Sequence, residues 1–123
     1  MTVKTLPLKT GAYLYGTDSD DTIARDQIVL KSGSGVCLSG TVLGKITATG
    51  KYTPINFGAS DGSQHFAGIL YAETDATAAD RKAVATVRLQ EVVAERLIWP
   101  AGATNVQTAG ALVEAAAVYV IAR

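Results

Sequence analysis

Short apolar segments, separated by glycine, serine, threonine and aspartate, recur along the chain from Gln27 onward. Apolar and polar positions alternate in the segment 42–47 and again in 83–89. Alternation with a period of two is typical of half-buried strands. We therefore predict strands at 28–30, 42–47, 51–55, 66–72, 83–89 and 118–121, and surface loops or turns at 59–63 and 74–80. In 83–89 the alternation predicts two faces, with Val84, Thr86 and Arg88 opposite Ala83, Ala85, Val87 and Leu89.

A tight turn at Thr49-Gly50 joins two of these predicted strands into a hairpin. Glycine adopts a positive φ without steric cost, so Gly50 is expected to supply that conformation. Pro54 lacks a backbone N–H and therefore marks the returning strand as an edge, or as the point where pairing ends.

One helix is predicted near the end of the chain. Thr104 and Gln107 have the spacing of a capping box, in which each side chain bonds the backbone of the other residue. A stripe of small apolar residues follows at three- and four-residue spacing, and we expect it to pack on a sheet: Val106, Ala109, Gly110, Val113, Ala116 and Ala117. The predicted fold class is therefore mainly β with a C-terminal helix.

The first 26 residues differ in composition from the remainder. Apolar residues come in brief bursts interrupted by Gly11 and Gly16, and the tract 17–21 is acidic. Such a segment buries too little apolar surface to offset the entropy of ordering it. We predict a flexible N-terminal arm at 1–26, with an ordinary edge strand and loop as the alternative, and a β-rich domain at 27–123.

Charge and length exclude several classes of protein. The 123 residues suffice for one domain, and the 11 basic and 11 acidic residues cancel. Direct nucleic-acid binding is not expected, because nucleic-acid binders usually carry a basic excess. Met1–Thr10 has no apolar signal region, and no stretch is long enough to span a membrane, so synthesis in the cytoplasm and no membrane association are predicted. The charged share of 18% is below the usual ~25%, so part of the surface is expected to be covered by copies or a partner.

No catalytic, metal or cofactor site can be assembled from the candidate residues. Cys37 and His65 are the only cysteine and the only histidine, too few for a zinc site, and no nucleophile motif surrounds Cys37. We interpret Cys37 as a small buried side chain and His65 as a surface or packing residue. The acidic tract 17–21 lacks the glycine and closing glutamate of a calcium loop. The chain is therefore predicted not to be an enzyme.

An alternative interpretation concerns Lys51, which directly follows Gly50 at the predicted hairpin tip. Biotin and lipoyl carrier domains present a modified lysine on such a turn. In those carriers the lysine stands between specific neighbours, methionine or aspartate, whereas Lys51 stands between Gly50 and Tyr52. A native mass spectrum without an adduct at Lys51 would exclude this interpretation.

The ordered series of motifs resembles the head decoration proteins of tailed bacteriophages, of the lambda protein D type. The resemblance covers roughly Gln27–Arg123. It rests on Leu38–Tyr52, Ala59–Gln64, Ala67–Leu70, Asp75–Thr77, Val87-Arg88, Glu91-Val92 and Leu97–Pro100. The resemblance implies a compact β-clip-like domain that forms a homotrimer. The trimer would stand on three-fold and quasi-three-fold sites of the expanded head, contact the major capsid protein and stabilise the virion exterior against DNA pressure.

In the family that the chain resembles, the N-terminal arm orders on the capsid by adding a strand to the major capsid protein. The start of the present chain has the β-propensity that such a strand needs, and Pro7 limits further pairing. The predicted capsid-binding residues are Thr2, Val3, Lys4, Thr5, Leu6, Pro7 and Leu8. A monomeric β-clip module that binds some other ligand remains the alternative, and the oligomeric state distinguishes the two.

Overall fold

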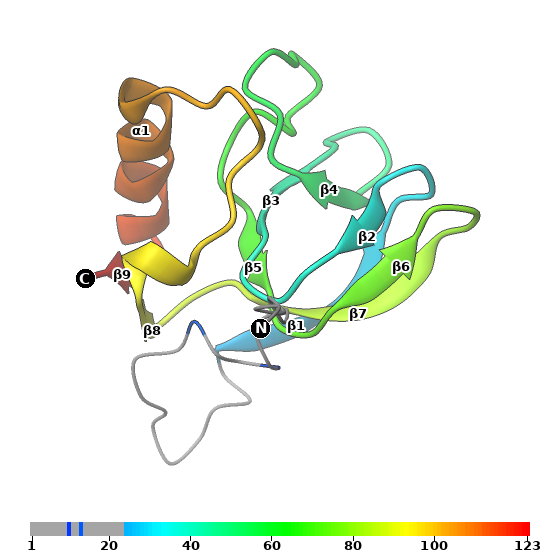
Figure 1. The fold of residues 1–123 in the computed structure, drawn as a ribbon, viewed down its shortest axis with the longest axis horizontal. Coiled ribbons are helices and arrows are strands. Elements are labelled where there is room, and N and C mark those ends of the chain that lie inside the picture. Colours follow the sequence, from blue (N-terminus) through cyan, green and yellow to red (C-terminus); the bar gives the residue numbers. More distant parts are fainter. Residues whose placement is uncertain (1–9, 11–12, 14–23) are drawn as a thin grey trace, which may run out of the picture.

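The computed structural model describes Thr10, Tyr13 and residues 24–123 (Figure 1). The described part is mainly β with one C-terminal helix, which confirms the predicted fold class. The elements in chain order are β1 (Arg25–Leu30), β2 (Gly35–Cys37), β3 (Val42–Lys45), β4 (Tyr52–Pro54), β5 (Gly68–Leu70), β6 (Thr74–Ala76), β7 (Arg81–Thr86), β8 (Gln90–Val92), a 3-10 turn (Ala94–Arg96), α1 (Asn105–Ala116) and β9 (Val120–Ala122).

Five strands form a small closed barrel in the order β1-β4-β3-β5-β7. Strand β1 pairs antiparallel with β7 over all six of its residues, from Arg25 opposite Thr86 to Leu30 opposite Arg81. Its other neighbour is the parallel strand β4, and that pairing consists of the single pair Leu30 and Tyr52. The barrel is therefore firmly joined on one side of β1 and closed at only one point on the other.

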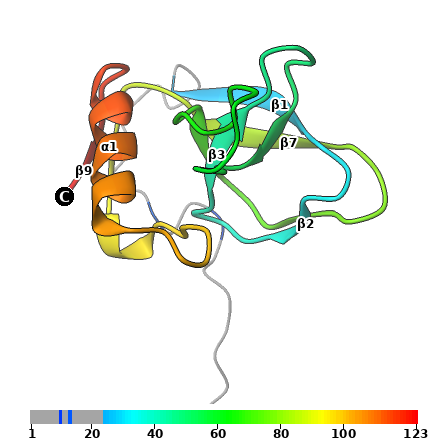
Figure 2. The same ribbon diagram turned by 90° about the horizontal axis from the view of Figure 1, so that it is seen from above.

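Two small sheets extend the barrel. Strands β2 and β6 form an antiparallel pair, and β8 and β9 form a parallel pair that lies next to α1. Viewed from above, α1 and β9 stand together at one side of the molecule, while the β2 end projects from the opposite side (Figure 2).

The apolar interior is divided into two clusters. One fills the space between the barrel and α1 and contains Tyr13, Val42, Ile55, Ile69, Val92, Leu97, Ala111, Ala115 and Val120. The other lies inside the barrel and contains Ile28, Leu30, Cys37, Leu43, Leu70, Ala76, Ala85 and Val87. Burial of this apolar surface supplies the main favourable term for folding. Cys37 is buried in the second cluster, as predicted.

Gly44 in β3 lies against the backbone of the 59–63 turn. A Cβ atom at this position would stand 2.1 Å from the carbonyl oxygen of Ser63, which accepts a hydrogen bond from the Asn56 N–H. Substitution Gly44→Ala is therefore expected to lower the free energy of unfolding by about 1–3 kcal/mol, measured by urea denaturation. The matched control is Gly110→Ala in α1, where a Cβ meets nothing within 4 Å. That control should gain up to about 1 kcal/mol through helix propensity. Equal effects at both positions would contradict the close contact at Gly44.

The helix begins where the sequence predicted, but it buries a different face. Thr104 and Gln107 form both bonds of the capping box. The buried residues are Ala111 and Ala115, whereas the predicted stripe faces outward, with Val106 83% and Val113 71% exposed. The expectation that this stripe packs on a sheet was wrong, because the shorter alanine pair allows α1 to approach the barrel more closely.

Two further predictions need correction. The segment 74–80 was expected to be a loop, but its first three residues form β6 by pairing with β2. In 83–89 the two predicted faces do not hold to the end. Thr86 is fully buried beside Ala85, and Leu89 has a φ of 53° and is half exposed. A positive φ breaks the alternation of side chains that an extended strand requires.

Candidate partner-binding surfaces

Tyr13 is packed into the core between the barrel and α1. Its side chain is fully buried, and its hydroxyl lies 2.5 Å from Thr86 Oγ1 and 3.4 Å from the Ile69 carbonyl oxygen. Its own carbonyl accepts a 2.7 Å hydrogen bond from the Val93 N–H. Burial raises the pKa of the Tyr13 phenol to about 12, although the hydrogen bond to Thr86 partly opposes that rise. Tyr13 is therefore a core residue within the range 1–26.

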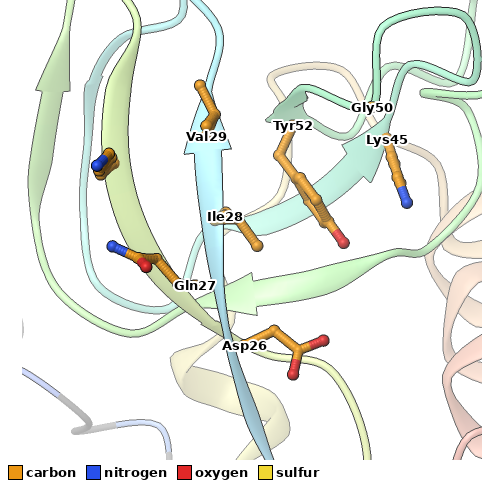
Figure 3. A pocket seen from close by; sticks show the side chains of 8 residues that line it. Asp26, Gln27, Ile28, Val29, Lys45, Gly50 and Tyr52 are labelled. Atoms are coloured by element: carbon orange, nitrogen blue, oxygen red, sulfur yellow. The ribbon is translucent and has the colours of Figure 1, made fainter.

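A groove lies beside β1 at the nearly open side of the barrel. Its volume is about 410 Å³, and it is lined by Asp26, Gln27, Ile28, Val29, Lys45, Gly50, Tyr52 and Lys82. Figure 3 shows Asp26 and Ile28 on the β1 side of this space, with Tyr52 and Lys45 across from them. The groove exists because β1 and β4 separate after their single pair at Leu30 and Tyr52.

The groove carries an excess of positive charge. Its one carboxylate, Asp26, is paired with the Arg88 guanidinium at 2.6 Å. The Lys45 ammonium stands 5.8 Å from the centre of the Tyr52 ring. Burial raises the pKa of the Tyr52 phenol, and the negative charge of Asp26 raises it further. The ion pairs between described residues include neither Lys45 nor Lys82.

A second candidate surface is the outer side of α1 together with the neighbouring chain segments. We call it the helix surface. It is apolar, and its large side chains are more than a third exposed: Leu89, Val106, Val113, Val118, Tyr119 and Ile121. Val106, Val113 and Tyr119 are more than two thirds exposed. Large exposed apolar side chains of this kind are candidates for protein–protein contact.

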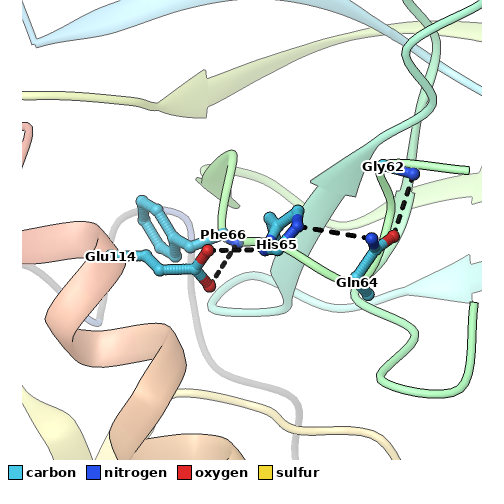
Figure 4. Close-up of polar contacts among 5 residues, drawn as sticks. All are labelled: Gly62, Gln64, His65, Phe66 and Glu114. Atoms are coloured by element: carbon cyan, nitrogen blue, oxygen red, sulfur yellow. Dashed lines mark hydrogen bonds and ion pairs between the residues drawn. The ribbon is translucent and has the colours of Figure 1, made fainter. Parts of the chain in front are cut away.

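Polar contacts between the 62–66 segment and α1 hold the helix in place (Figure 4). His65 Nδ1 lies 2.6 Å from Glu114 Oε2, and the Phe66 N–H donates to Glu114 Oε1 at 3.3 Å. Gln64 Oε1 accepts from the Gly62 N–H. His65 is exposed and serves packing between elements, as the sequence indicated.

The remaining candidates for chemistry are placed apart from one another. Lys51 Nζ forms a 2.7 Å ion pair with Asp80, and Gly50 has the expected positive φ of 72°. Among the described residues, no group of three metal-ligating side chains comes together. No helix in the described part is long and apolar enough to cross a membrane.

The predicted arm residues Thr2–Leu8 and the acidic tract 17–21 lie outside the described residues. The groove and the buried position of Tyr13 were not anticipated from the sequence. The groove depends on how far apart two distant strands lie. No local pattern reports that separation.

Among curated protein sequences, none matches the chain. A family model described as Bacteriophage lambda head decoration protein D matches residues 3–120. The match spans nearly the whole chain, including most of the first 26 residues. The chain therefore belongs to the bacteriophage lambda head decoration protein D family.

Proposed function

We propose that this protein binds the exterior of an expanded bacteriophage head as a homotrimer and stabilises the shell against internal DNA pressure. Membership of the head decoration family, from residue 3 to residue 120, is the observation that carries the proposal. The protein acts through binding and has no catalytic step. Its partner is the major capsid protein, and its location is the outer surface of the virion.

The helix surface supports the homotrimer. It presents several large apolar side chains, and its three most exposed members, Val106, Val113 and Tyr119, carry no formal charge. A neutral apolar surface can pack against a copy of the same chain without electrostatic repulsion. Packing would remove these side chains from water, at about 25 cal/mol for each Å² buried.

The N-terminal strand Thr2–Leu8 supplies the contact with the shell. Strand addition uses main-chain hydrogen bonds, so it depends little on the side chains of either partner. One such segment binds weakly, because ordering it offsets part of the interaction energy. Three segments on one trimer raise the effective concentration of the second and third, and avidity can then increase about 10²- to 10⁴-fold. One trimer would thereby bridge neighbouring capsid subunits.

Substitution Val113→Lys is expected to convert the trimer into monomers. Val113 is 71% exposed in the single chain, so the fold should tolerate lysine, whereas burial of an unpaired ammonium in an apolar contact is costly. Size-exclusion chromatography with light scattering measures the mass directly. Val36→Lys is the matched control, because Val36 is also exposed but lies in β2, away from the helix surface. A trimeric Val113→Lys variant would show that the copies meet elsewhere.

The proposed function itself is tested by co-sedimentation of the full chain with expanded, undecorated heads. Saturable binding in multiples of three, together with greater resistance of the heads to heating, is the expected result. A monomeric protein that does not sediment with heads would favour the alternative β-clip module for another ligand.

A further inference from the structure

We propose that the groove beside β1 accepts an extended, acidic segment of the capsid shell as an added β-strand. The shell as the source of that segment rests on the proposed function, whereas the acceptor site is argued from this chain alone. The protein would thus receive a strand at β1 in addition to lending one from Thr2–Leu8.

The backbone of β1 has hydrogen-bonding groups directed into the groove. In an antiparallel pair, alternate residues direct their N–H and C=O groups to opposite edges of the strand. The Lys31 N–H donates to the Tyr52 carbonyl, on the β4 side. Counting back in steps of two, the N–H and C=O groups of Gln27 and the N–H of Val29 point to the same side. Among the described residues, β1 is paired on this side only at Leu30, and strand edges with few pairing partners are templates for another strand.

The pairing with β7 confirms this alternation. The Val87 N–H donates to the Ala24 carbonyl, and Asp26 and Ile28 lie opposite Ala85 and Ala83 in the same register. The Tyr71 N–H donates to Val84, the residue opposite Gln27, from the far side of β7. Gln27 therefore belongs to the set of residues whose backbone groups face away from β7.

Charge selects the occupant. Asp26 is paired with Arg88, whereas Lys45 and Lys82 take part in no ion pair with a described residue. Carboxylates on an incoming strand would meet these ammonium groups, whereas a basic strand would be repelled. Side chains of an added strand alternate between its two faces, so acidic residues at every second position would fit.

The acceptor site is tested without any phage component, using two synthetic peptides and the ¹⁵N-labelled full chain. One peptide alternates valine and glutamate, and the other alternates valine and lysine. The acidic peptide is expected to shift the NMR amide signals of Gln27 and Val29 and to slow their hydrogen exchange. The basic peptide should leave both signals in place. Absence of any shift with the acidic peptide, or equal shifts with both, would overturn the proposal.

Two variants locate the binding. Gln27→Pro replaces the N–H that faces the groove while it leaves the ladder with β7 intact, so the protein should fold and lose peptide binding. Lys45→Glu combined with Lys82→Glu should weaken binding by a factor of about ten, the effect of losing two exposed ion pairs. Lys31→Glu is the control for charge, because Lys31 does not line the groove. Unchanged binding by folded Gln27→Pro would also refute the added strand.

Sedimentation with expanded heads then separates this inference from the proposed function. If wild type binds heads and the groove variants bind as well as wild type, the groove proposal fails and the decoration role stands. If the acidic peptide binds the groove but wild type does not bind heads, the proposed function fails and the acceptor site stands.

Discussion

A chain that lacks Met1–Leu8 is expected to fold and form trimers, yet to leave expanded heads undecorated. The body of the protein is held together by residues from Tyr13 onward, so removal of the first eight residues deletes none of the described core. It would remove all three added strands from a trimer at once. Linking three segments on one trimer raises the apparent affinity for heads by at least about 10²-fold, so this affinity should fall by at least that factor. Co-sedimentation at increasing protein concentration measures this loss.

A pair of point variants distinguishes strand addition from contact through side chains. Thr5→Val keeps the backbone N–H and the β-propensity, so it should decorate heads like wild type. Thr5→Pro removes a backbone N–H and fixes φ in the middle of the segment, so it should decorate less well. Normal decoration by the truncated chain would refute a role for Thr2–Leu8 and would leave the β1 groove or the body of the trimer as the binding surface.

Tyr13→Ala should be among the most destabilising substitutions in the described part of the chain. It empties a fully buried aromatic site between the barrel and α1, and large-to-small changes of this kind lower the free energy of unfolding by about 3–5 kcal/mol. It also leaves the buried Thr86 hydroxyl without its partner. Urea denaturation followed by circular dichroism measures the effect. A loss below about 1 kcal/mol would mean that Tyr13 does not occupy this site in solution.

The phenol of Tyr13 also predicts how stability depends on alkaline pH. Its pKa is about 12 in the folded protein and 10.0 in an unperturbed chain. Between these values the phenol loses its proton in the unfolded state first. The contribution of Tyr13 to the free energy of unfolding is therefore complete below pH 10 and falls as pH rises toward 12. The two-unit difference corresponds to about 2–3 kcal/mol. Tyr13→Phe removes this contribution, so its stability should vary less with pH over the same range. Identical pH profiles for wild type and Tyr13→Phe would contradict the burial.

Local signals in the sequence predicted most of the helices and strands, but few of the pairings and packing contacts between them. The capping box at Thr104 and the positive φ at Gly50 are determined by neighbouring residues, and both were found. Strand β6 was missed because its three residues become a strand only through pairing with β2. The buried face of α1 was assigned wrongly because an apolar stripe does not tell whether its partner is the same chain or another molecule.

For the candidate surfaces too, the sequence carried local information but not the contacts between distant residues. Resemblance to a family indicated a role on a phage head, and the family match confirms that family. The binding segment Thr2–Leu8 stays a prediction. The β1 groove could not be predicted, because it arises where two strands 22 residues apart in the sequence meet at one residue and then separate (Leu30 and Tyr52). Tyr13 was assigned to the arm because of the composition of residues 1–26. Its burial depends on residues far away in the sequence, and composition carries no information about such contacts.

The position of Tyr13 determines how mechanical load would enter the protein. If the proposed segment Thr2–Leu8 is bound to a shell, tension on it would reach Tyr13, whose hydroxyl is hydrogen-bonded to Thr86 at the end of β7. Strand β7 is joined to β1 by six consecutive residue pairs, and the chain continues into β1. A load passed from Tyr13 to Thr86 would thus reach a strand that six residue pairs hold to its neighbour. We therefore expect that, in an expanding shell, the bound segment would detach before the barrel unfolds.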